Sequence, residues 1–139
     1  MSKINGIYAA SVSILDENLK LDIHKTIQHS ENLIKSGCHG VVIFGSTGQS
    51  QLISLEEKFE LIQNISKSIF KDKFIIGTGL NSLQDTISLI KISNSYNFNN
   101  FLIMPPAYYM YEDKDVIRFY IKLIEKLSNC KIILYNFEK

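Results

Sequence analysis

The chain has 139 residues, enough for one hydrophobic core and not two, so we interpret residues 1–139 as a single domain. Its 15 Lys and Arg residues nearly balance 14 Asp and Glu residues, and a net charge of +1 excludes a strong positive field for nucleic acid or an anionic membrane. A small molecule is therefore the expected partner.

Nothing in the composition indicates export, a membrane span or a metal. The N-terminus has no apolar segment long enough for a signal peptide, and no apolar run approaches the roughly 18 residues of a transmembrane helix. Cys38 and Cys130 each precede an apolar run without a CxxC partner, so we expect buried, reduced thiols. His24 and His29 do not share a helix face, which argues against a metal pair. We expect a cytoplasmic protein.

In chain order, the first apolar run is Ile7–Val12, and the helix expected after it covers Ile23 to Ser36. Asp22 is the expected N-cap of that helix, and Gly37 is expected to end it. A short apolar run followed by a longer amphipathic pattern predicts one strand and one helix.

The second unit is the most informative one. A buried strand is predicted at Gly40 to Phe44, and a capping box of Ser54 and Glu57 opens the following helix. The loop after the strand reads Gly45-Ser46-Thr47-Gly48-Gln49. Two glycines allow a bend whose N–H groups turn outward, which suits carboxylate or phosphate oxygens; a plain tight turn is the alternative.

The same alternation continues to the end of the chain, which predicts parallel strands covered by helices. The remaining expected elements are strands at Phe74–Gly77, Phe101–Met104 and Lys131–Tyr135, and helices from Ser82 to about Tyr96 and from Val116 to Leu127. A doubly wound open sheet and part of a (β/α)₈ barrel both fit. The segment after the first strand, Ser11 to Asp16, has no glycine, which argues against a dinucleotide-binding sheet. We therefore expect strands one to five of a (β/α)₈ TIM barrel, an α/β fold.

Hydroxyls and glycines follow every predicted strand, at the rim where barrel enzymes carry their chemistry. These residues are Ser11 and Ser13, Ser46 and Thr47, Gly77-Thr78-Gly79, Pro105-Pro106-Ala107-Tyr108-Tyr109, and Tyr135-Asn136. His39 falls on the opposite rim and is expected to be structural. The inner wall of the barrel is expected to include Ile43, Ile75, Ile103 and Ile133.

With these motifs in this order, the whole chain resembles the pyruvate-dependent Schiff-base aldolases that include dihydrodipicolinate synthase and N-acetylneuraminate lyase. The resemblance also rests on Gly6 and on the helix start Leu52-Ile53-Ser54-Leu55-Glu56-Glu57. It implies a lyase without a cofactor that condenses or cleaves a pyruvate-derived 2-oxo acid, in a homo-oligomer. The second substrate stays open between aspartate semialdehyde, a sugar-derived 2-oxo acid and a hydroxyproline-pathway acid.

By this resemblance, Ser46, Thr47 and Gly48 would bind the substrate carboxylate. Tyr135 would transfer protons, hydrogen-bonded to Ser46 and to Tyr108, and Tyr108 would reach the site of a neighbouring subunit. A phenol placed by neighbouring hydroxyls suits the proton transfers of imine chemistry. The alternatives are a core tyrosine for Tyr135 and an ordinary aromatic loop for Tyr108.

The sequence also departs from the family. Ser13-Ile14 stands where Thr-Pro is usual, and Gln49 where Glu is usual. The Schiff-base lysine belongs on a sixth strand, so none is expected in this chain. Neither Lys114, among acidic neighbours, nor Lys139, at the C-terminus, is a convincing nucleophile.

Three functions follow as hypotheses. The first is a Schiff-base lyase truncated before its lysine. The second is a catalytically inactive half-barrel stabilised by association with another chain. The third is an anion-binding open α/β domain that uses the glycine loops.

Overall fold

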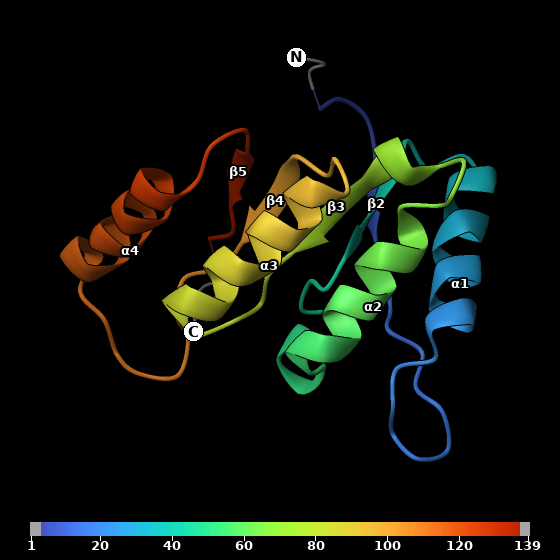
Figure 1. The fold of residues 1–139 in the computed structure, drawn as a ribbon, viewed down its shortest axis with the longest axis horizontal. Helices are drawn as coiled ribbons and strands as arrows, with labels where there is room; N and C mark the ends of the chain where they lie inside the picture. Colours follow the sequence, from blue (N-terminus) through green and yellow to red (C-terminus); the bar gives the residue numbers. More distant parts are fainter. Residues whose placement is uncertain (1–3, 137–139) are drawn as a thin grey trace.

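The computed structural model of the protein describes residues 4–136, and it shows five strands that alternate with four α-helices (Figure 1). Two short 3₁₀ helices, η1 and η2, complete the described elements. In chain order these are β1 (Tyr8–Ala10), α1 (Ile23–Lys35), β2 (Gly40–Ile43), η1 (Ser50–Leu52), α2 (Leu55–Ile65), η2 (Lys71–Lys73), β3 (Phe74–Gly77), α3 (Leu83–Ser95), β4 (Asn100–Ile103), α4 (Asp113–Lys126) and β5 (Lys131–Leu134).

The helix starts follow their capping residues. Asp22 and Ser82 accept hydrogen bonds from the third backbone amide of α1 and α3, and the predicted capping box of Ser54 and Glu57 opens α2. Helix α4 begins at Asp113 rather than at the predicted Val116, because Glu112 forms a capping box of its own. All four predicted helices are confirmed, with this earlier start for α4.

All five strands are parallel and follow one another in the order β1-β2-β3-β4-β5. Helices α1, α2 and α3 lie in front of the sheet in Figure 1, each beside the next in sequence. A doubly wound sheet reverses its strand order at a switch point and has helices on both faces. Neither feature is present in the described strands. The arrangement is that of the N-terminal half of a TIM barrel, as predicted, and it is not that of a doubly wound sheet.

The main core lies between the helices and the sheet, and it corrects one expectation. Ile43 and Ile103, predicted to face the barrel interior, are 2% and 0% exposed and belong to the cluster that the helices cover. The strand register instead pairs Val42 with Ile75, and Leu102 with Ile133, on the opposite face. Continuously apolar strands carry no alternation that could have distinguished the two faces.

Helix α4, the last of the four, has a row of solvent-exposed apolar side chains. Ile117, Ile121 and Ile124 are each about half exposed or more, and their spacing places them on one side of the helix. On β5, Leu134 is also exposed. No helix in residues 4–136 has the length and apolar character that crossing a membrane requires.

Candidate active site at the carboxyl ends of the strands

The loop after β2 is shaped by its flanking residues rather than by its glycines. Phe44 and Gln49 have φ angles of 56° and 48°, in the left-handed region, whereas Gly45 and Gly48 do not. The prediction that these two glycines make the bend is therefore wrong in its mechanism. Gly48 lies close to the first strand's loop: a Cβ there would lie 3.0 Å from the carbonyl oxygen of Ser11, so a side chain would require a small shift of that backbone. Left-handed non-glycine residues are costly and concentrate at functional sites.

This loop presents backbone donors without partners. Within residues 4–136, the amides of Ser46, Thr47 and Gly48 donate no hydrogen bond, whereas those of Gln49 and Ser50 are bonded to Ser46 and Gly45 carbonyls. Consecutive N–H groups that are not used by the fold form a concave donor site for an anion. These three amides are available to a ligand, and the anion site at this loop stays a prediction.

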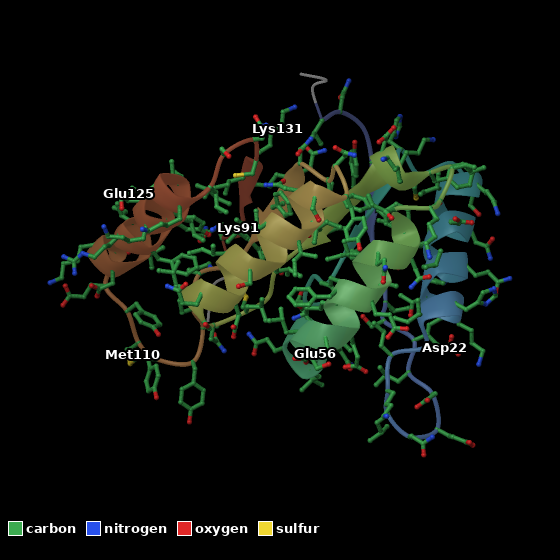
Figure 2. All side chains as sticks on the ribbon, in the orientation of Figure 1. Asp22, Glu56, Lys91, Met110, Glu125 and Lys131 are labelled. Atoms are coloured by element: carbon green, nitrogen blue, oxygen red, sulfur yellow. The ribbon has the colours of Figure 1, made fainter. Side chains whose placement is uncertain are left out.

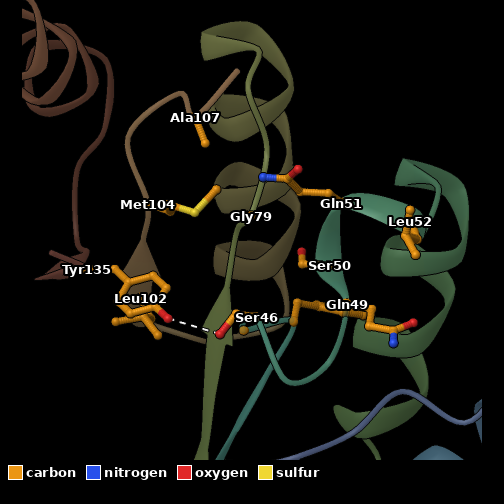
Figure 3. A pocket seen from close by; sticks show the side chains of 12 residues that line it. Ser46, Gln49, Ser50, Gln51, Leu52, Gly79, Leu102, Met104, Ala107 and Tyr135 are labelled. Atoms are coloured by element: carbon orange, nitrogen blue, oxygen red, sulfur yellow. Dashed lines mark hydrogen bonds between the residues drawn. The ribbon is translucent and has the colours of Figure 1, made fainter. Parts of the chain in front are cut away.

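Two hydroxyl groups meet across the sheet above β2 and β5. Ser46 Oγ and Tyr135 Oη are 3.0 Å apart, and either can be the donor (Figure 3). The backbone amide of Tyr135 donates to the carbonyl of Ile103 at 3.0 Å, which fixes the start of its loop. The predicted contact between Ser46 and Tyr135 is thus present in the structure.

A pocket of about 470 Å³ opens beside this pair of hydroxyls. Its walls come from the loops after β2, β3, β4 and β5, and its surface is largely apolar. The lining residues are Phe44, Gly45, Ser46, Gln49, Ser50, Gln51, Leu52, Gly79, Leu102, Met104, Ala107 and Tyr135. A concave apolar site with a few convergent polar groups is typical of a small-molecule site.

The other predicted site residues lie beside this pocket rather than in it. Thr47 is exposed and does not line it, and Gly48 is buried, with its carbonyl accepting from Ser13 Oγ at 2.6 Å. Tyr108 is 80% exposed, and its ring packs edge-on against Tyr109 at a centroid distance of 4.9 Å. Tyr108 therefore does not line the pocket of its own chain.

Not every hydroxyl at the strand ends serves the pocket. Ser11 Oγ lies 2.8 Å from Ser30 Oγ of α1, and therefore joins strand to helix. Thr78 is fully buried, and its Oγ1 has no hydrogen-bond partner in the described residues. On the opposite rim, His39 Nδ1 accepts from the amide of Ile7 at 3.0 Å, which agrees with the structural role predicted for His39.

Of the two lysines considered from the sequence, the structure describes only Lys114, which does not line the pocket. Lys114 forms an exposed ion pair with Glu112 at 2.6 Å, and Lys139 lies outside the described residues. Sequence reasoning missed Lys58, which is fully buried in α2 and whose pKa falls to about 8 because burial disfavours its charge, with Asp85 opposing the shift. Its position three, four and seven residues before Leu61, Ile62 and Ile65 was the available signal, since that spacing places Lys58 on the apolar face.

The cysteines and acidic groups show no metal chemistry. Cys38 and Cys130 are free and half-buried, and burial raises the pKa of the Cys130 thiol. Among residues 4–136, no three His, Cys, Asp or Glu side chains are grouped so that they could hold a metal ion.

Comparison with known proteins gives the family. The profile of the dihydrodipicolinate synthetase family matches residues 3–139. A 4-hydroxy-tetrahydrodipicolinate synthase from Desulforudis audaxviator is 27% identical over 131 residues, which are 94% of this chain and 44% of that protein.

Two solved structures agree with this match. Dihydrodipicolinate synthase from Agrobacterium tumefaciens shares the fold with a TM-score of 0.87 at 22% identity, over 95% of this chain and 47% of that one. A variant of 2-keto-3-deoxygluconate aldolase from Sulfolobus solfataricus, in a pyruvate complex, has a TM-score of 0.84 at 26% identity. The match covers 96% of this chain and 45% of that one. The chain thus spans about half the length of the relatives it matches, and it belongs to the dihydrodipicolinate synthetase family.

Proposed function

We propose that this chain supplies the carboxylate site and the proton-transferring hydroxyls of a pyruvate-dependent Schiff-base lyase. The observation that carries the proposal is the Ser46–Tyr135 hydrogen bond of 3.0 Å beside a pocket of about 470 Å³. Family membership supports the reaction class, because the relatives matched are synthases and aldolases of this kind.

In the proposed reaction, the free amides of Ser46, Thr47 and Gly48 bind the carboxylate of a 2-oxo acid such as pyruvate. The oxo carbon then lies near the hydroxyl pair. When an amine adds to that carbon, the oxo oxygen gains one proton to give the carbinolamine hydroxyl and a second to leave as water. The amine nitrogen gives up two protons as the C=N bond forms, and Tyr135 with Ser46 carries these protons from nitrogen to oxygen. Serine keeps the hydroxyl that this transfer needs.

The amine of this reaction comes from outside the pocket described here. Among residues 4–136 no lysine lines the pocket, and we propose that the Schiff-base lysine lies on a further strand of the complete barrel, as the family resemblance implies. Thr47 and Gly48 act only through their backbone amides in this scheme. Tyr108, displayed on the surface, acts at the site of a neighbouring subunit in a homo-oligomer.

A second candidate function is a half-barrel without catalysis that is stabilised by another chain. Its supporting observations are the exposed apolar row of α4, formed by Ile117, Ile121 and Ile124, and the edge of β5 that pairs with no strand in the described residues. Further βα units, supplied by another chain, could pair with this strand edge and cover the apolar row. The two candidates differ in whether the chain binds a 2-oxo acid by itself.

Titration of the isotope-labelled chain with pyruvate, followed by NMR, tests the proposal. We expect saturable shifts of the amides from Gly45 to Gln49, and at least about fivefold weaker binding in Ser46→Ala, the factor for one hydrogen bond. Ser66→Ala is the matched control, because the Ser66 hydroxyl bonds Gln63 within α2, away from the pocket. Shifts that are absent, or that are equal in Ser46→Ala, would contradict the proposal.

A further inference from the structure

Lys58 is the buried ionisable group that the proposed chemistry does not use. Its side chain is fully buried, whereas lysines that form ion pairs, such as Lys25 and Lys114, are well exposed. A buried ammonium is unfavourable unless it is well paired, and Lys58 has one hydrogen bond, to the Thr78 carbonyl at 3.4 Å. The ring of Phe44 lies 5.7 Å from its Nζ and adds a cation–π contact.

The Thr78 carbonyl receives two side-chain donors at once. Besides Lys58 from α2, Ser50 Oγ of η1 donates to it at 3.0 Å. The amide of Thr78 donates to the Leu102 carbonyl of β4 at 3.0 Å. Thr78, the first residue after β3, is therefore held from α2, η1 and β4 together.

This junction lies directly behind the pocket wall. Ser50 and Gly79 both line the pocket, and Gly79, at φ 53°, allows a contact in which any Cβ would overlap the Ser50 side chain. A shift of Thr78 would therefore move Gly79 and Ser50, and with them one side of the pocket. Lys58 does not line the pocket, so it can act there only through these neighbours.

We propose that Lys58 is a positioning residue, which holds the carboxyl end of β3 through the Thr78 carbonyl and so sets the Ser50 and Gly79 wall of the pocket. The proposal rests on the proposed 2-oxo-acid site for its effect on binding, but the Lys58–Thr78 contact can be tested separately. Buried ionisable groups with shifted pKa values cluster at functional sites.

The first test needs no substitution. Around Lys58, the charged group that acts on it is Asp85 of α3, while Phe44, Ser50 and Thr78 contact the region from the strand ends and carry no charge. A pH titration by NMR should show the Lys58 Nζ and the Thr78 carbonyl carbon changing together, with one midpoint near 8. A Thr78 carbonyl that does not follow the Lys58 titration would overturn the proposal.

The second test uses substitutions and pyruvate. Lys58→Met keeps the apolar stem but removes the donor, and it should abolish the Thr78 titration and weaken pyruvate binding about fivefold, the factor for one hydrogen bond. Lys91→Met, at an exposed position on α3 (Figure 2), is the control and should change neither. Ser50→Ala should also weaken binding, and the double variant should lose less than the product of the two losses, since both act on one carbonyl.

The outcomes separate the two proposals. Unchanged binding in Lys58→Met, or independent losses in the double variant, would refute the role of Lys58. If the unaltered chain binds no pyruvate, the proposed function fails, and the shared titration of Lys58 and Thr78 alone decides the contact.

Discussion

Ser46 and Tyr135 are 89 positions apart, and the barrel topology alone brings their hydroxyls to 3.0 Å. Each residue follows a parallel strand, so both lie at the same edge of the sheet. A phenol hydrogen-bonded to a second hydroxyl can pass a proton without a charged side chain. The chemistry of the proposed site therefore depends on this one pair.

At this residue scale, Tyr135→Phe should retain the fold and lose proton transfer. In a fusion of this chain with the remaining strands of a relative, turnover should fall by roughly 10²-fold or more, the range for general acid–base groups. The measurement is the steady-state rate of pyruvate-dependent aldol cleavage or condensation. Tyr96→Phe, at the C-terminus of α3, is the matched tyrosine control. Unchanged turnover in Tyr135→Phe would remove this residue from the mechanism.

Lys58 should make stability depend on pH in an unusual direction. Its pKa is lowered to about 8 in the folded chain from a reference of 10.5, so folding carries a cost below pH 8 that disappears as pH rises to 10.5. At about 1.4 kcal/mol per unit, this cost is about 3 kcal/mol at most. Lys58→Met should therefore unfold at higher denaturant concentration than the unaltered chain at pH 7.

Denaturant unfolding of the unaltered chain and of Lys58→Met at several pH values checks this prediction. Their difference in the free energy of unfolding should shrink steadily between pH 8 and pH 10, because only the unaltered chain contains the titrating amine. A difference in the free energy of unfolding that stays constant with pH, or a Lys58→Met variant that is less stable at neutral pH, would contradict this prediction. Either result would show that the fold compensates the cost of burying the amine.

At the scale of elements, the start of α2 is a junction as well as a helix cap. Glu57 accepts from the amide of Ser54 at 2.9 Å, and with its other oxygen from the amide of Leu21 at 2.8 Å. These hydrogen bonds, that of Leu21 first, lower the pKa of the Glu57 carboxyl. The side chain thus ties α2 to the loop before α1 and fixes the base of the site loop.

Glu57→Ala should cost about 1–3 kcal/mol in the free energy of unfolding at pH 7, because the partly buried amide of Leu21 and the amide of Ser54 lose a charged acceptor. Glu56→Ala, next to it and exposed in the same first turn (Figure 2), should change stability by less than about 0.5 kcal/mol. Since the folded pKa of Glu57 is lowered, its contribution is complete above its reference value of 4.5 and is lost as pH falls below it. Denaturant unfolding at pH 7 and pH 3 measures both effects, and equal costs for the two variants would contradict the account.

The elements that the sequence predicts well are those with local signals. Strand β3 matches its predicted bounds, and the caps Asp22, Ser54 and Ser82 begin their helices as expected. Each of these depends on residues within one turn. The start of α4 was missed because a glutamate, Glu112, takes the N-cap position that is usually expected to hold a shorter side chain.

The features that were not predictable depend on tertiary contacts. Ile43 and Ile103 lie on the helix-covered face of the sheet. The sequence does not indicate this face, because a continuously apolar strand has no alternation of apolar and polar residues. The burial of Lys58 was indicated by its spacing, but its charge argued for solvent. The left-handed φ of Phe44 has no sequence signal, because glycine or asparagine would be expected at such a position.

At the scale of the whole molecule, five of the eight strands of a barrel leave two open edges. The strands β1 and β5 each pair on one side only within the described residues, and α4 has an exposed apolar row. Unpaired strand edges and exposed apolar rows favour association. We therefore expect the isolated chain to form dimers or larger species, or to be insoluble, and to bind a hydrophobic dye.

Sedimentation velocity and dye fluorescence at micromolar concentration check this expectation. Replacing Ile121 and Ile124 by Glu should reduce association and dye binding, because it places charges within the apolar row of α4. Ile69→Glu is the control, since Ile69 is 90% exposed and lies outside this row. A compact monomer that binds no dye would contradict the exposed-edge account.

The most direct test of the central claim is imine trapping with borohydride, because it asks which polypeptide supplies the amine and which supplies the site. The chain is incubated with pyruvate alone, and then together with the C-terminal half of the Desulforudis audaxviator relative, before mass spectrometry. We expect no pyruvyl adduct on this chain, and an adduct on the added half that forms only when this chain is present and falls strongly with Ser46→Ala. An adduct on Lys58 or Lys114, or labelling of the added half that does not depend on this chain, would contradict the account.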